Sequence, residues 1–416
     1  MSKINDLIKK LCPNGVFFKK IGEIANYRRG SFPQPYTNES YYGGEDAMPF
    51  VQVADVKDNF RLVDSTKNTI SKPAQPLSVF VPKGTVIVTL QGTIGRVAIT
   101  QYDAYIDRTL AIFEGLSSEL NTKYFVYQLK SKFDYEKQFA RGSTIKTITK
   151  EEMTEFKIPI PPIEVQEEIV KILDKFGELE AELEAELEAR ESQYEFWSGK
   201  IFESQMNGET KHITDIALVK ARVGWQRLTK SEYLNAGDYY LITGTDFTLD
   251  GKIDFNNCVY VTKERYEMDK NIQVHENDIL ITKDGTLGKI AYLENEPDKL
   301  TTLNSGVFRI KIIDDNVLPR YIYHYFNSKI FKDFIAKVKT GSTIPHLTQE
   351  KLVGLNIPIP NIEEQKKIIS ILDKFSDLTR SLSVGLPAEI KLRRKQYEYY
   401  RNKLLNFKVQ NIYEEN

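Results

Sequence analysis

Residues 158–176, IPIPPIEVQEEIVKILDKF, return almost unchanged 199 positions later as residues 357–375, IPIPNIEEQKKIISILDKF. A shorter match, Gly-Ser-Thr-Ile at 142–145 and again at 341–344, lies at the same offset. Matches that share one offset mean that the chain contains two copies of one unit. Two copies that fold alike form a pseudo-twofold object, which suits a target that offers the same geometry twice.

The repeated stretch predicts a long helix in each copy. In the first copy, Pro161 and Pro162 can end a short strand and begin the helix, because proline is tolerated in a first helical turn. Apolar residues then recur in alternating steps of four and three, which is typical of a coiled-coil helix. These residues are Val165, Ile169, Ile172, Phe176, Leu179 and Leu183, and beyond a stutter the stripe resumes at Arg190, Tyr194, Trp197 and Ile201. We expect a helix over residues 164–202.

The second copy repeats this apolar stripe but gains four residues around Val384–Pro387. Gly385 and Pro387 should kink or break the second helix. An apolar stripe of this length favours burial, so the economical arrangement is an antiparallel pair of helices within the chain. The residues expected to contact the partner helix are Gln166, Ile169, Phe176, Leu183, Gln365, Phe375 and Tyr397.

The segments before each helix are rich in short β-branched and aromatic runs separated by Gly, Pro and Asn, which is typical of strands. Strands are predicted at 50–53, 86–89 and 96–99 and again at 240–243, 278–282 and 289–292, with helices near 121–139 and 319–337. The predicted fold class is α/β: two mixed α/β globular domains separated by two long helices that form an antiparallel coiled coil. The expected boundaries are 1–158 and 207–357 for the domains and 159–206 and 358–416 for the helices.

Composition indicates a soluble globular protein, since 41% of the 416 residues are hydrophobic and 28% are charged. No apolar run reaches the roughly 20 residues of a membrane span, and the first residues lack a signal-peptide core. We therefore expect a cytoplasmic protein with no membrane partner. Cys12, Cys258 and the four histidines do not fall at metal-ligand spacing, so neither a disulfide framework nor a metal site is predicted.

The charge is unevenly distributed. Residues 164–191 hold eleven acidic and three basic residues and carry a net charge of −8, which leaves +7 on the rest of a chain whose total is −1. The overall charge therefore does not argue against nucleic acid. For the acidic run itself, a solvated helix face is favoured over a dedicated partner site.

Signatures of catalysis are missing from the sequence. Gly285–Lys289 resembles a phosphate-binding loop but lacks its full spacing, and no dinucleotide fingerprint, nucleophile elbow, zinc-protease motif or amino-methyltransferase signature occurs. The chain is predicted to be a binding protein with no catalytic residues, metal or cofactor of its own.

Two glycine-rich turns recur in both copies and are candidates for nucleic-acid contact, since glycine permits close backbone approach and Thr, Arg and Lys contact phosphates. Tight turns kept for folding or helix capping are an equal alternative. Further candidates lie where the copies differ. The repeat aligns the segment from Arg28 with that from Arg222, and Arg108 with Asn304. Such differences suit two domains that read different sequences, because Arg reads guanine and Asn reads adenine. Random sequence drift between the two copies would produce the same kind of difference. The DNA-binding candidates are Arg28, Arg29, Gly92, Thr93, Arg96, Arg108, Arg141, Ser143, Thr144, Lys146, Arg222, Arg227, Lys283, Thr286, Lys289, Asn304, Ser342, Thr343 and His346.

The doubled order Gly-Ser-Thr, Ile-Pro-Ile-Pro, Gln-x-x-Ile and Ile-Leu-Asp-Lys-Phe resembles the specificity subunits of type I restriction–modification enzymes over almost the whole chain. Residues 11–16 (LCPNGV), the Gly-Thr-x-Gly turns, and Gln166 and Gln365 carry further resemblance. The resemblance implies two target recognition domains that each read one half of a bipartite double-stranded DNA site. It also implies helices that set the gap between the half-sites and dock two methyltransferase subunits.

The resemblance places the chemistry in other subunits. S-adenosylmethionine, ATP and Mg would belong to methyltransferase and motor–nuclease partners, whose complex methylates adenine and cleaves DNA in an ATP-dependent manner. Two alternatives stay open: a coiled-coil structural adaptor whose globular domains bind proteins, and a detached specificity half of a single-chain restriction enzyme. The half-site sequences, the gap length and the side chain that contacts each base do not follow from the sequence.

Overall fold

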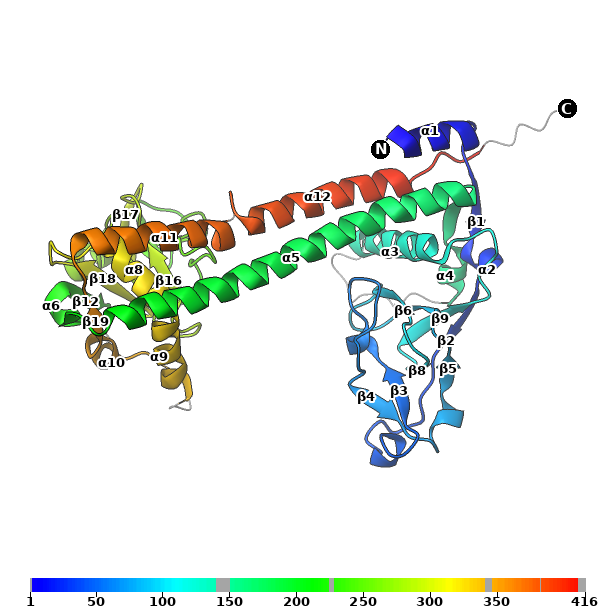
Figure 1. The fold of residues 1–416 in the computed structure, drawn as a ribbon, viewed down its shortest axis with the longest axis horizontal. Helices are drawn as coiled ribbons and strands as arrows, with labels where there is room; N and C mark the ends of the chain where they lie inside the picture. The colour runs from blue at the N-terminus through cyan, green and yellow to red at the C-terminus, as the bar shows by residue number, and fades with distance from the viewer. Residues whose placement is uncertain (1, 140–149, 224–227, 341–345, 382, 411–416) are drawn as a thin grey trace. The chain divides into compact units, whose positions relative to one another are not determined.

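The computed structural model describes residues 2–139, 150–223, 228–340, 346–381 and 383–410. The chain divides into two compact units (Figure 1). Unit 1 comprises Met1–Ala181 together with Arg393–Asn416, and unit 2 comprises Glu182–Leu392. Both divisions fall inside long helices, because one half of each helix packs with the globular part of one unit.

Unit 1 contains two four-stranded sheets. The first has the order β2 (Asn26–Arg29), β9 (Leu110–Glu114), β6 (Val86–Thr89), β7 (Val97–Ile99) and is antiparallel throughout. The second has the order β4 (Asn68–Ile70), β3 (Met48–Val51), β8 (Ala104–Ile106), β5 (Val79–Val81), with β3 and β8 parallel. A small antiparallel pair, β1 (Phe17–Lys20) and β10 (Lys157–Ile160), leads into the long helix.

Strand β6 shows how the core of unit 1 is built. Alternate side chains of a strand point to opposite faces of the sheet. Val86 and Val88 pack with Phe113 against the helical side, whereas Ile87 and Ile112 pack against the second sheet. Both faces are covered, which explains why the strand is an unbroken apolar run in the sequence.

Unit 2 repeats this architecture. Its first sheet has the order β12 (Ala217–Ala221), β18 (Val307–Ile312), β15 (Ile279–Thr282), β16 (Ile290–Tyr292). Its second sheet has the order β14 (Val259–Tyr260), β13 (Tyr239–Ile242), β17 (Leu300–Leu303), again with one parallel pair, β13 and β17. The small pair is β11 (Thr210–His212) with β19 (Asn356–Pro358).

Helices cover the first sheet in each unit. Unit 1 has α1 (Ser2–Leu11), α2 (Ile21–Ile24), α3 (Thr122–Phe139) and α4 (Lys150–Glu155), and unit 2 has α6 (Ile213–Ile216), α7 (Lys263–Glu267), α8 (Pro319–Asn327), α9 (Lys329–Thr340) and α10 (Gln349–Val353). The predicted single helix near 319–337 is thus wrong: Ser328 separates α8 from α9, and its hydroxyl donates to the carbonyl of Tyr325 at 2.7 Å. Short 3-10 helices lie at Glu39–Tyr41, Val53–Asp55, Gln75–Leu77, Lys230–Glu232 and Lys270–Ile272.

The long helices predicted from the repeat are present. Helix α5 spans Ile163–Gln205 and contributes residues to both units. The second copy forms two helices, α11 (Ile362–Arg380) and α12 (Leu386–Leu405). The four-residue gain therefore breaks the second helix. Next to the break, a Cβ atom on Gly385 would lie 2.3 Å from the carbonyl oxygen of Asp377, so only glycine fits there.

Side-chain contacts inside each unit show that the helix segments run antiparallel, as the fold prediction has it. In unit 1, Phe176 of α5 contacts the rings of Tyr397 and Tyr400 of α12, and Glu180 pairs with Arg394 at 2.5 Å. As the residue number increases along α5, the residue number of its contact on α12 decreases. In unit 2, Tyr194 of α5 contacts Phe375 of α11.

Candidate nucleic-acid interface

A turn with the same internal bonds follows the central strand of the first sheet in each unit. In unit 1 the buried hydroxyl of Thr89 donates to the carbonyl of Thr93 and accepts from the backbone N–H of Arg96 at 3.0 Å. In unit 2 Thr282 donates to the carbonyl of Thr286 at 2.5 Å and accepts from the N–H of Lys289 at 2.9 Å. One buried threonine therefore fixes each glycine-rich turn.

The two glycines of each turn have different roles, although all have positive φ. Gly95 sits under α3, where an added Cβ would approach Phe133 to 2.7 Å, and Gly288 sits under α9, where it would approach Ile335 to 3.0 Å. Gly92 lies at the exposed tip, with only Val53 within 4 Å, 3.5 Å from its Cβ position. The base of the turn is packed against a helix and its tip is open.

Several loops meet the glycine-rich turn at one edge of the sheets. In unit 1 the N–H of Leu90 donates to the carbonyl of Thr109 at 2.8 Å, and the N–H of Asp107 donates to the carbonyl of Val51 at 3.0 Å. The antiparallel pairing of β6 and β2 with β9 places the ends of the first two opposite the start of the third. We name this assembly loop edge 1; it comprises residues 30–32, 51–53, 90–95 and 107–109.

Unit 2 has a corresponding loop edge 2, which comprises residues 222–223, 242–246, 283–288, 304–306 and 346–347. The N–H of Lys283 donates to the carbonyl of Gly306 at 2.9 Å, and the N–H of Asn304 donates to the carbonyl of Ile242 at 2.9 Å. Both bonds have a partner in unit 1. The two units therefore present the same set of loops on the same framework.

The candidate residues of unit 1 divide into two groups. Gly92, Thr93 and Arg108 are exposed on loop edge 1, and Arg29 is exposed at the adjoining end of β2. Two other arginines already have acidic partners within the fold: Arg28 pairs with Glu114 at 2.6 Å, and Arg96 pairs with Asp58 at 3.0 Å. Their charges are partly compensated, which weakens the case for them as DNA contacts.

Among the described residues, loop edge 2 has fewer exposed basic side chains without an acidic partner than loop edge 1. Thr286 is exposed, but the side chain of Arg222 is buried and donates to the carbonyl of Leu303 at 2.8 Å and to Thr302 at 3.1 Å. Burial lowers the pKa of Arg222. The ammonium group of Lys283 lies 5.1 Å from the ring centre of Phe308, and burial lowers its pKa too.

Three further candidates of unit 2 are partly buried or paired. His346 is exposed and its Nδ1 contacts Asp284. Asn304 and Lys289 are half-buried. Seven candidates lie outside the described residues: Arg141, Ser143, Thr144, Lys146, Arg227, Ser342 and Thr343.

The structure corrects the predicted correspondence between the copies. Asn304 matches Asp107 and not Arg108, because the side chain of each accepts from the N–H two residues later, Thr109 at 2.9 Å and Gly306 at 3.1 Å. The residue that matches Arg108 is Ser305. Insertions between the copies change the offset, so it is not the same throughout the chain.

The alignment of Arg28 with Arg222 is wrong as well. Arg28 pairs with Ile112 of β9, and Lys220 pairs with Arg309 of β18, in equivalent registers. Lys220 is therefore the counterpart of Arg28.

Gln166 and Gln365 were expected to contact the partner helix, but each binds the globular part of its own unit. Gln166 accepts from the N–H of Asn121 at 2.8 Å and donates to the carbonyls of Glu119 and Pro161, both at 2.8 Å. Gln365 makes the same three contacts, with Leu318, Asn316 and Pro360. The amide of a glutamine both donates and accepts, and so joins three backbone segments at the start of each long helix.

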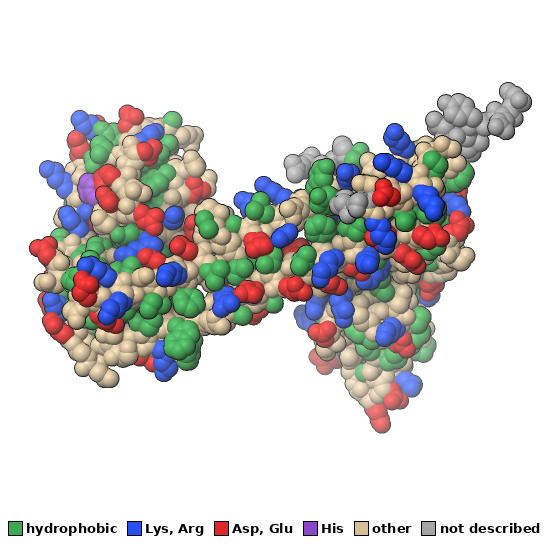
Figure 2. Space-filling model, turned by 45° about the horizontal axis from the view of Figure 1, so that its top comes forward, with side chains coloured by type: hydrophobic (Ala, Val, Ile, Leu, Met, Phe, Trp, Pro, Cys, Tyr) green, Lys and Arg blue, Asp and Glu red, His purple; other side chains and the backbone are tan. Residues whose placement is uncertain are grey.

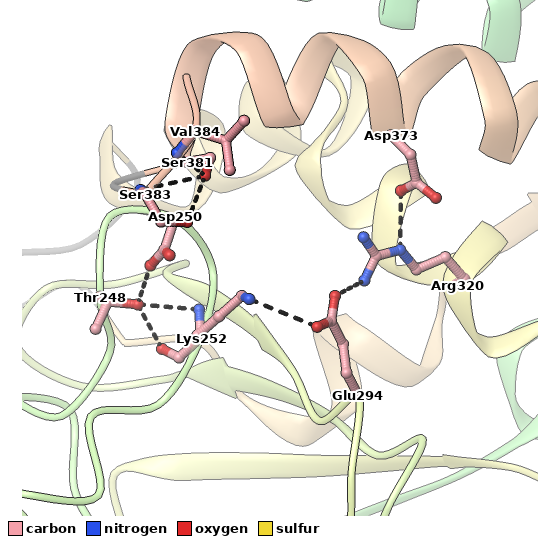
Figure 3. Close-up of polar contacts among 9 residues, drawn as sticks. All are labelled: Thr248, Asp250, Lys252, Glu294, Arg320, Asp373, Ser381, Ser383 and Val384. Atoms are coloured by element: carbon pink, nitrogen blue, oxygen red, sulfur yellow. Dashed lines mark hydrogen bonds and ion pairs between the residues drawn. The ribbon is translucent and has the colours of Figure 1, made fainter. Parts of the chain in front are cut away.

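An aspartate about two turns further along anchors the same helix to its domain. Asp174 accepts from the hydroxyl of Tyr127 at 2.9 Å and pairs with Lys123. The counterpart in unit 2 is Asp373, which pairs with Arg320 at 2.9 Å, while the other end of that guanidinium binds Glu294 at 2.8 Å (Figure 3). Sequence reasoning missed this anchor, although its aspartate lies within the repeated Ile-Leu-Asp-Lys-Phe.

His324 completes the anchor of unit 2. Its side chain is fully buried, and Nε2 donates to Asp373 at 2.7 Å. Burial lowers the pKa of His324, although Asp373 opposes this shift. For Asp373, burial raises the pKa, but hydrogen bonds from His324 and Arg320, with the positive charge of Arg320, lower the pKa overall. The imidazole is therefore held neutral beside an ionised carboxylate.

The remaining predicted helix contacts take several forms. Phe176 contacts Tyr397, and Phe375 contacts Tyr194. Ile169 is fully buried in the core of unit 1. Leu183 is half-buried. Trp197, expected in the buried stripe, is 51% exposed.

Each unit has apolar side chains on its helices that reach the surface and that sequence reasoning did not separate from the stripe. Apolar face 1, in unit 1, is our name for the exposed Tyr399 and the half-buried Ile172, Leu179 and Tyr400. Ile172 and Leu179 line a groove of about 740 Å³ together with Phe176, on which Tyr400 stacks. Apolar face 2, in unit 2, consists of the counterparts Ile371, Leu378, Phe196 and Trp197. Hydrophobic side chains reach the surface in both units (Figure 2).

In the part of the chain that the structure describes, no helix is long and apolar enough to cross a membrane. Among the same residues, no group of three or more His, Cys, Asp or Glu side chains is placed to hold a metal ion.

Comparison with known families gives a match in each copy. A family model described as "Type I restriction modification DNA specificity domain" matches residues 13–189 and residues 207–392. The two matches cover most of the chain and coincide with the two copies of the repeat.

Relatives carry corresponding descriptions. A Haemophilus influenzae protein described as a type I restriction enzyme specificity subunit is 35% identical over 279 residues, 65% of this chain and 68% of its own length. The EcoR124I/EcoR124II specificity subunit of Escherichia coli is 34% identical over 265 residues, 60% of this chain and 63% of its own. A Methanocaldococcus jannaschii specificity subunit is 22% identical over 407 residues, with 93% and 90% covered.

Solved structures share the fold. The type I S subunit from M. genitalium aligns with a TM-score of 0.50 at 17% identity and covers 94% of this chain and 96% of its own. A chain from a study of assembly and conformational transition in a type I system aligns with a TM-score of 0.61 at 15% identity, covering 95% and 98%.

Proposed function

The chain belongs to the family of type I restriction–modification DNA specificity proteins, and we propose that it selects DNA sites for a complex whose catalytic subunits are other chains. Loop edge 1 contacts one half of a bipartite double-stranded site and loop edge 2 contacts the other. The observation that carries this proposal is that one loop framework occurs twice and presents different residues in the two units.

The loop edges combine the two kinds of contact that sequence-specific recognition requires. Backbone N–H groups and hydroxyls at an open glycine-rich tip, such as Gly92 and Thr93, suit phosphate oxygens, which position a protein on DNA. Exposed side chains beside the tip, such as Arg108, can reach base edges, which specify the sequence. Each edge therefore both positions and specifies one half-site.

Helix α5 supports a role as the spacer between the half-sites. It continues for 43 residues and packs into both units. A continuous helix transmits a fixed length of 1.5 Å per residue, whereas a flexible linker would not. The gap between half-sites would then follow from helix length, as half-site spacing follows from dimer geometry in other DNA-binding proteins.

Apolar faces 1 and 2 support docking of two copies of one partner. Each face combines an isoleucine, a leucine and two neighbouring aromatic residues at corresponding positions. Exposed apolar patches of this kind mark interaction surfaces, and aromatic residues are common at the centre of such surfaces. We infer that each face docks one methyltransferase subunit, which supplies S-adenosylmethionine and adenine methylation, whereas motor–nuclease subunits supply ATP and Mg chemistry.

The deciding experiment is to map N6-methyladenine in the genome of a host that lacks other methyltransferases and expresses this chain with its methyltransferase subunit. The expected result is one split motif with a constant gap. Exchanging residues 15–157 for the corresponding domain of a relative should change only one half of that motif.

The other outcomes have distinct meanings. An absence of any methylated motif, with every methyltransferase subunit that binds the chain, would contradict the proposal and support a protein-binding adaptor. A continuous motif without a gap would contradict the bipartite site while leaving DNA recognition intact.

A further inference from the structure

A buried hydrogen-bond cluster stands directly behind one exposed residue of loop edge 1. Asp107 is 2% exposed; its Oδ1 accepts from the N–H of Thr109 at 2.9 Å, and its Oδ2 accepts from the hydroxyl of Tyr36 at 2.6 Å. Burial and the bond to Asp107 raise the pKa of Tyr36 to about 12, so its hydroxyl stays a donor. These contacts fix the turn that carries Arg108.

Unit 2 repeats the cluster with one chemical change. Asn304 takes the place of Asp107: its Oδ1 accepts from the N–H of Gly306 at 3.1 Å, and its Nδ2 donates to the hydroxyl of Tyr233. Tyr233 is thus the counterpart of Tyr36. The framework is retained in both copies. The residue at the next position is the exposed Arg108 in unit 1 and the half-buried Ser305 in unit 2, whose hydroxyl donates to Oδ1 of Asn304 at 3.1 Å.

Arg108 is both exposed and oriented. Its guanidinium carbon lies 5.2 Å from the ring centre of Tyr36, within the range of a cation–π contact. The ring of Tyr36 in turn stacks on the buried Phe32, with 5.1 Å between ring centres. Within the described ranges Arg108 forms no ion pair, unlike Arg28 and Arg96. A side-chain hydrogen bond with Tyr36 accompanies the ring contact, and the remaining N–H donors of the exposed guanidinium are not taken up by an acidic partner.

We propose that Arg108 reads a guanine in the half-site bound by unit 1, and that Ser305 is the corresponding reading position in unit 2. The inference rests on the proposed function and deepens it by assigning one specificity-determining position in each unit. Arginine pairs with the O6 and N7 atoms of guanine through two parallel hydrogen bonds, a geometry that lysine cannot reproduce. Stacking on Tyr36 removes side-chain freedom before DNA arrives, which favours this single geometry.

The test is to map methylated motifs, with sequencing and in vitro methylation rates, for the complex of the full chain with its methyltransferase subunit. Arg108→Ala should relax one guanine position in one half-site and leave the other half-site and the gap unchanged. A good bidentate contact discriminates by about 1–3 kcal/mol, so the preference at that position should fall by about 5- to 150-fold. Arg108→Lys should keep DNA affinity but relax the same position.

Arg61→Ala is the matched control. Arg61 is also exposed, but it lies on the turn beside Phe60, whose carbonyl accepts from the N–H of Ile99 at the opposite end of β7 from loop edge 1. The control should leave every motif position unchanged. Melting temperatures of the three variants should match that of the unaltered chain, because neither arginine is part of the core.

The outcomes separate this inference from the proposed function. An unchanged motif for Arg108→Ala, or methylation that weakens uniformly at all sites, would overturn the reading role, the second result indicating a phosphate contact. The absence of a split motif in the unaltered complex would instead overturn the proposed function. Domain exchange shows which half-site each unit reads. If Arg108→Ala relaxed the guanine preference in the half-site read by unit 2, the assignment would also be overturned.

Discussion

The hydroxyl of Tyr127 donates a hydrogen bond to Asp174 at 2.9 Å, and this bond ties helix α3 to helix α5 in unit 1. In unit 2 the corresponding place is held by His324, which donates to Asp373 at 2.7 Å. Both copies have the aspartate, but the residue that donates to it is a tyrosine in unit 1 and a histidine in unit 2. Burial raises the pKa of Tyr127 and lowers that of His324, so only the anchor of unit 2 has a group whose unfolded-state pKa lies near neutrality.

Unit 2 should lose stability on mild acidification. Because the folded-state pKa of His324 is depressed, its contribution is fully present above the unfolded value of about 6.5 and is lost as the pH falls below it. The loss should approach about 1.4 kcal/mol per pH unit. Circular dichroism melting curves between pH 7.5 and 5.5 measure this slope.

His324→Gln is the matched variant for that measurement, because its amide can still donate to Asp373 but does not titrate. The charged and titratable groups that face the imidazole are Asp373, Arg320, Arg380 and Tyr323. Asp373 has a lowered pKa, so its own contribution is lost only below its unfolded value near 3.8, outside this window. An equal slope for the variant and the unaltered chain would rule out His324 as the cause.

Gly95→Ala should destabilise unit 1 far more than Gly92→Ala. Both glycines have positive φ, which costs another residue about 1–2 kcal/mol. At Gly95 the new methyl group would also meet the ring of Phe133, 2.7 Å away, adding about 1–3 kcal/mol for overpacking. Urea unfolding compares the free energies, and equal losses at the two positions would show that the turn is not packed against α3.

Substitutions on one apolar face should remove one partner subunit and retain the other. Phe196→Ser combined with Trp197→Ser alters apolar face 2 only, and Tyr399→Ser alters apolar face 1 only. All three side chains are more than half exposed, so the fold should persist. Native mass spectrometry should then find one methyltransferase subunit in place of two. Lys200→Ser, an exposed neighbour on α5, serves as the control, and two bound subunits in every variant would refute the docking faces.

Deletion of Val384–Pro387 should change the gap between half-sites or abolish assembly. The deletion removes Val384 and Gly385 from the break between α11 and α12 and the first two residues of α12. Within the break, the N–H groups of Ser383 and Val384 donate to the hydroxyl of Ser381 (Figure 3). The deletion should let the two helices join and shift the register of α12. Methylome sequencing measures the gap, with Val384→Ala as a control because Val384 is 83% exposed. An unchanged gap with normal assembly would refute the role of the helices as spacer.

Much of the fold could be predicted because its signals are local. The alternation of apolar steps gave the long helix at α5, and the apolar run at Val86–Thr89 gave a central strand. Gly385 and Pro387 predicted a kink or a break in the second helix, and the structure has a break. The split at Ser328 was missed, because a serine does not by itself end a helix: Ser198 makes the same type of bond, to the carbonyl of Glu195, inside the continuous helix α5.

The candidate site was harder to predict, because its residues come together from loops that are distant in sequence. The offset of 199 that holds at the start of each long helix fails where loop lengths differ, so Arg108 was matched to Asn304 one position out of register. Likewise, whether an arginine is free or paired depends on the neighbour that the fold supplies, as Glu114 does for Arg28.

The sequence by itself determined that this protein is a duplication with two globular domains and long apolar-striped helices, because repeats and periodicities depend only on the order of residues along the chain. Only the tertiary structure decided which residues correspond between the copies and which polar groups stay available. Strand register and hydrogen bonds such as that of Asp107 with Tyr36 set both. Such bonds join segments tens of residues apart, and a buried polar group must find its partner in space rather than in sequence.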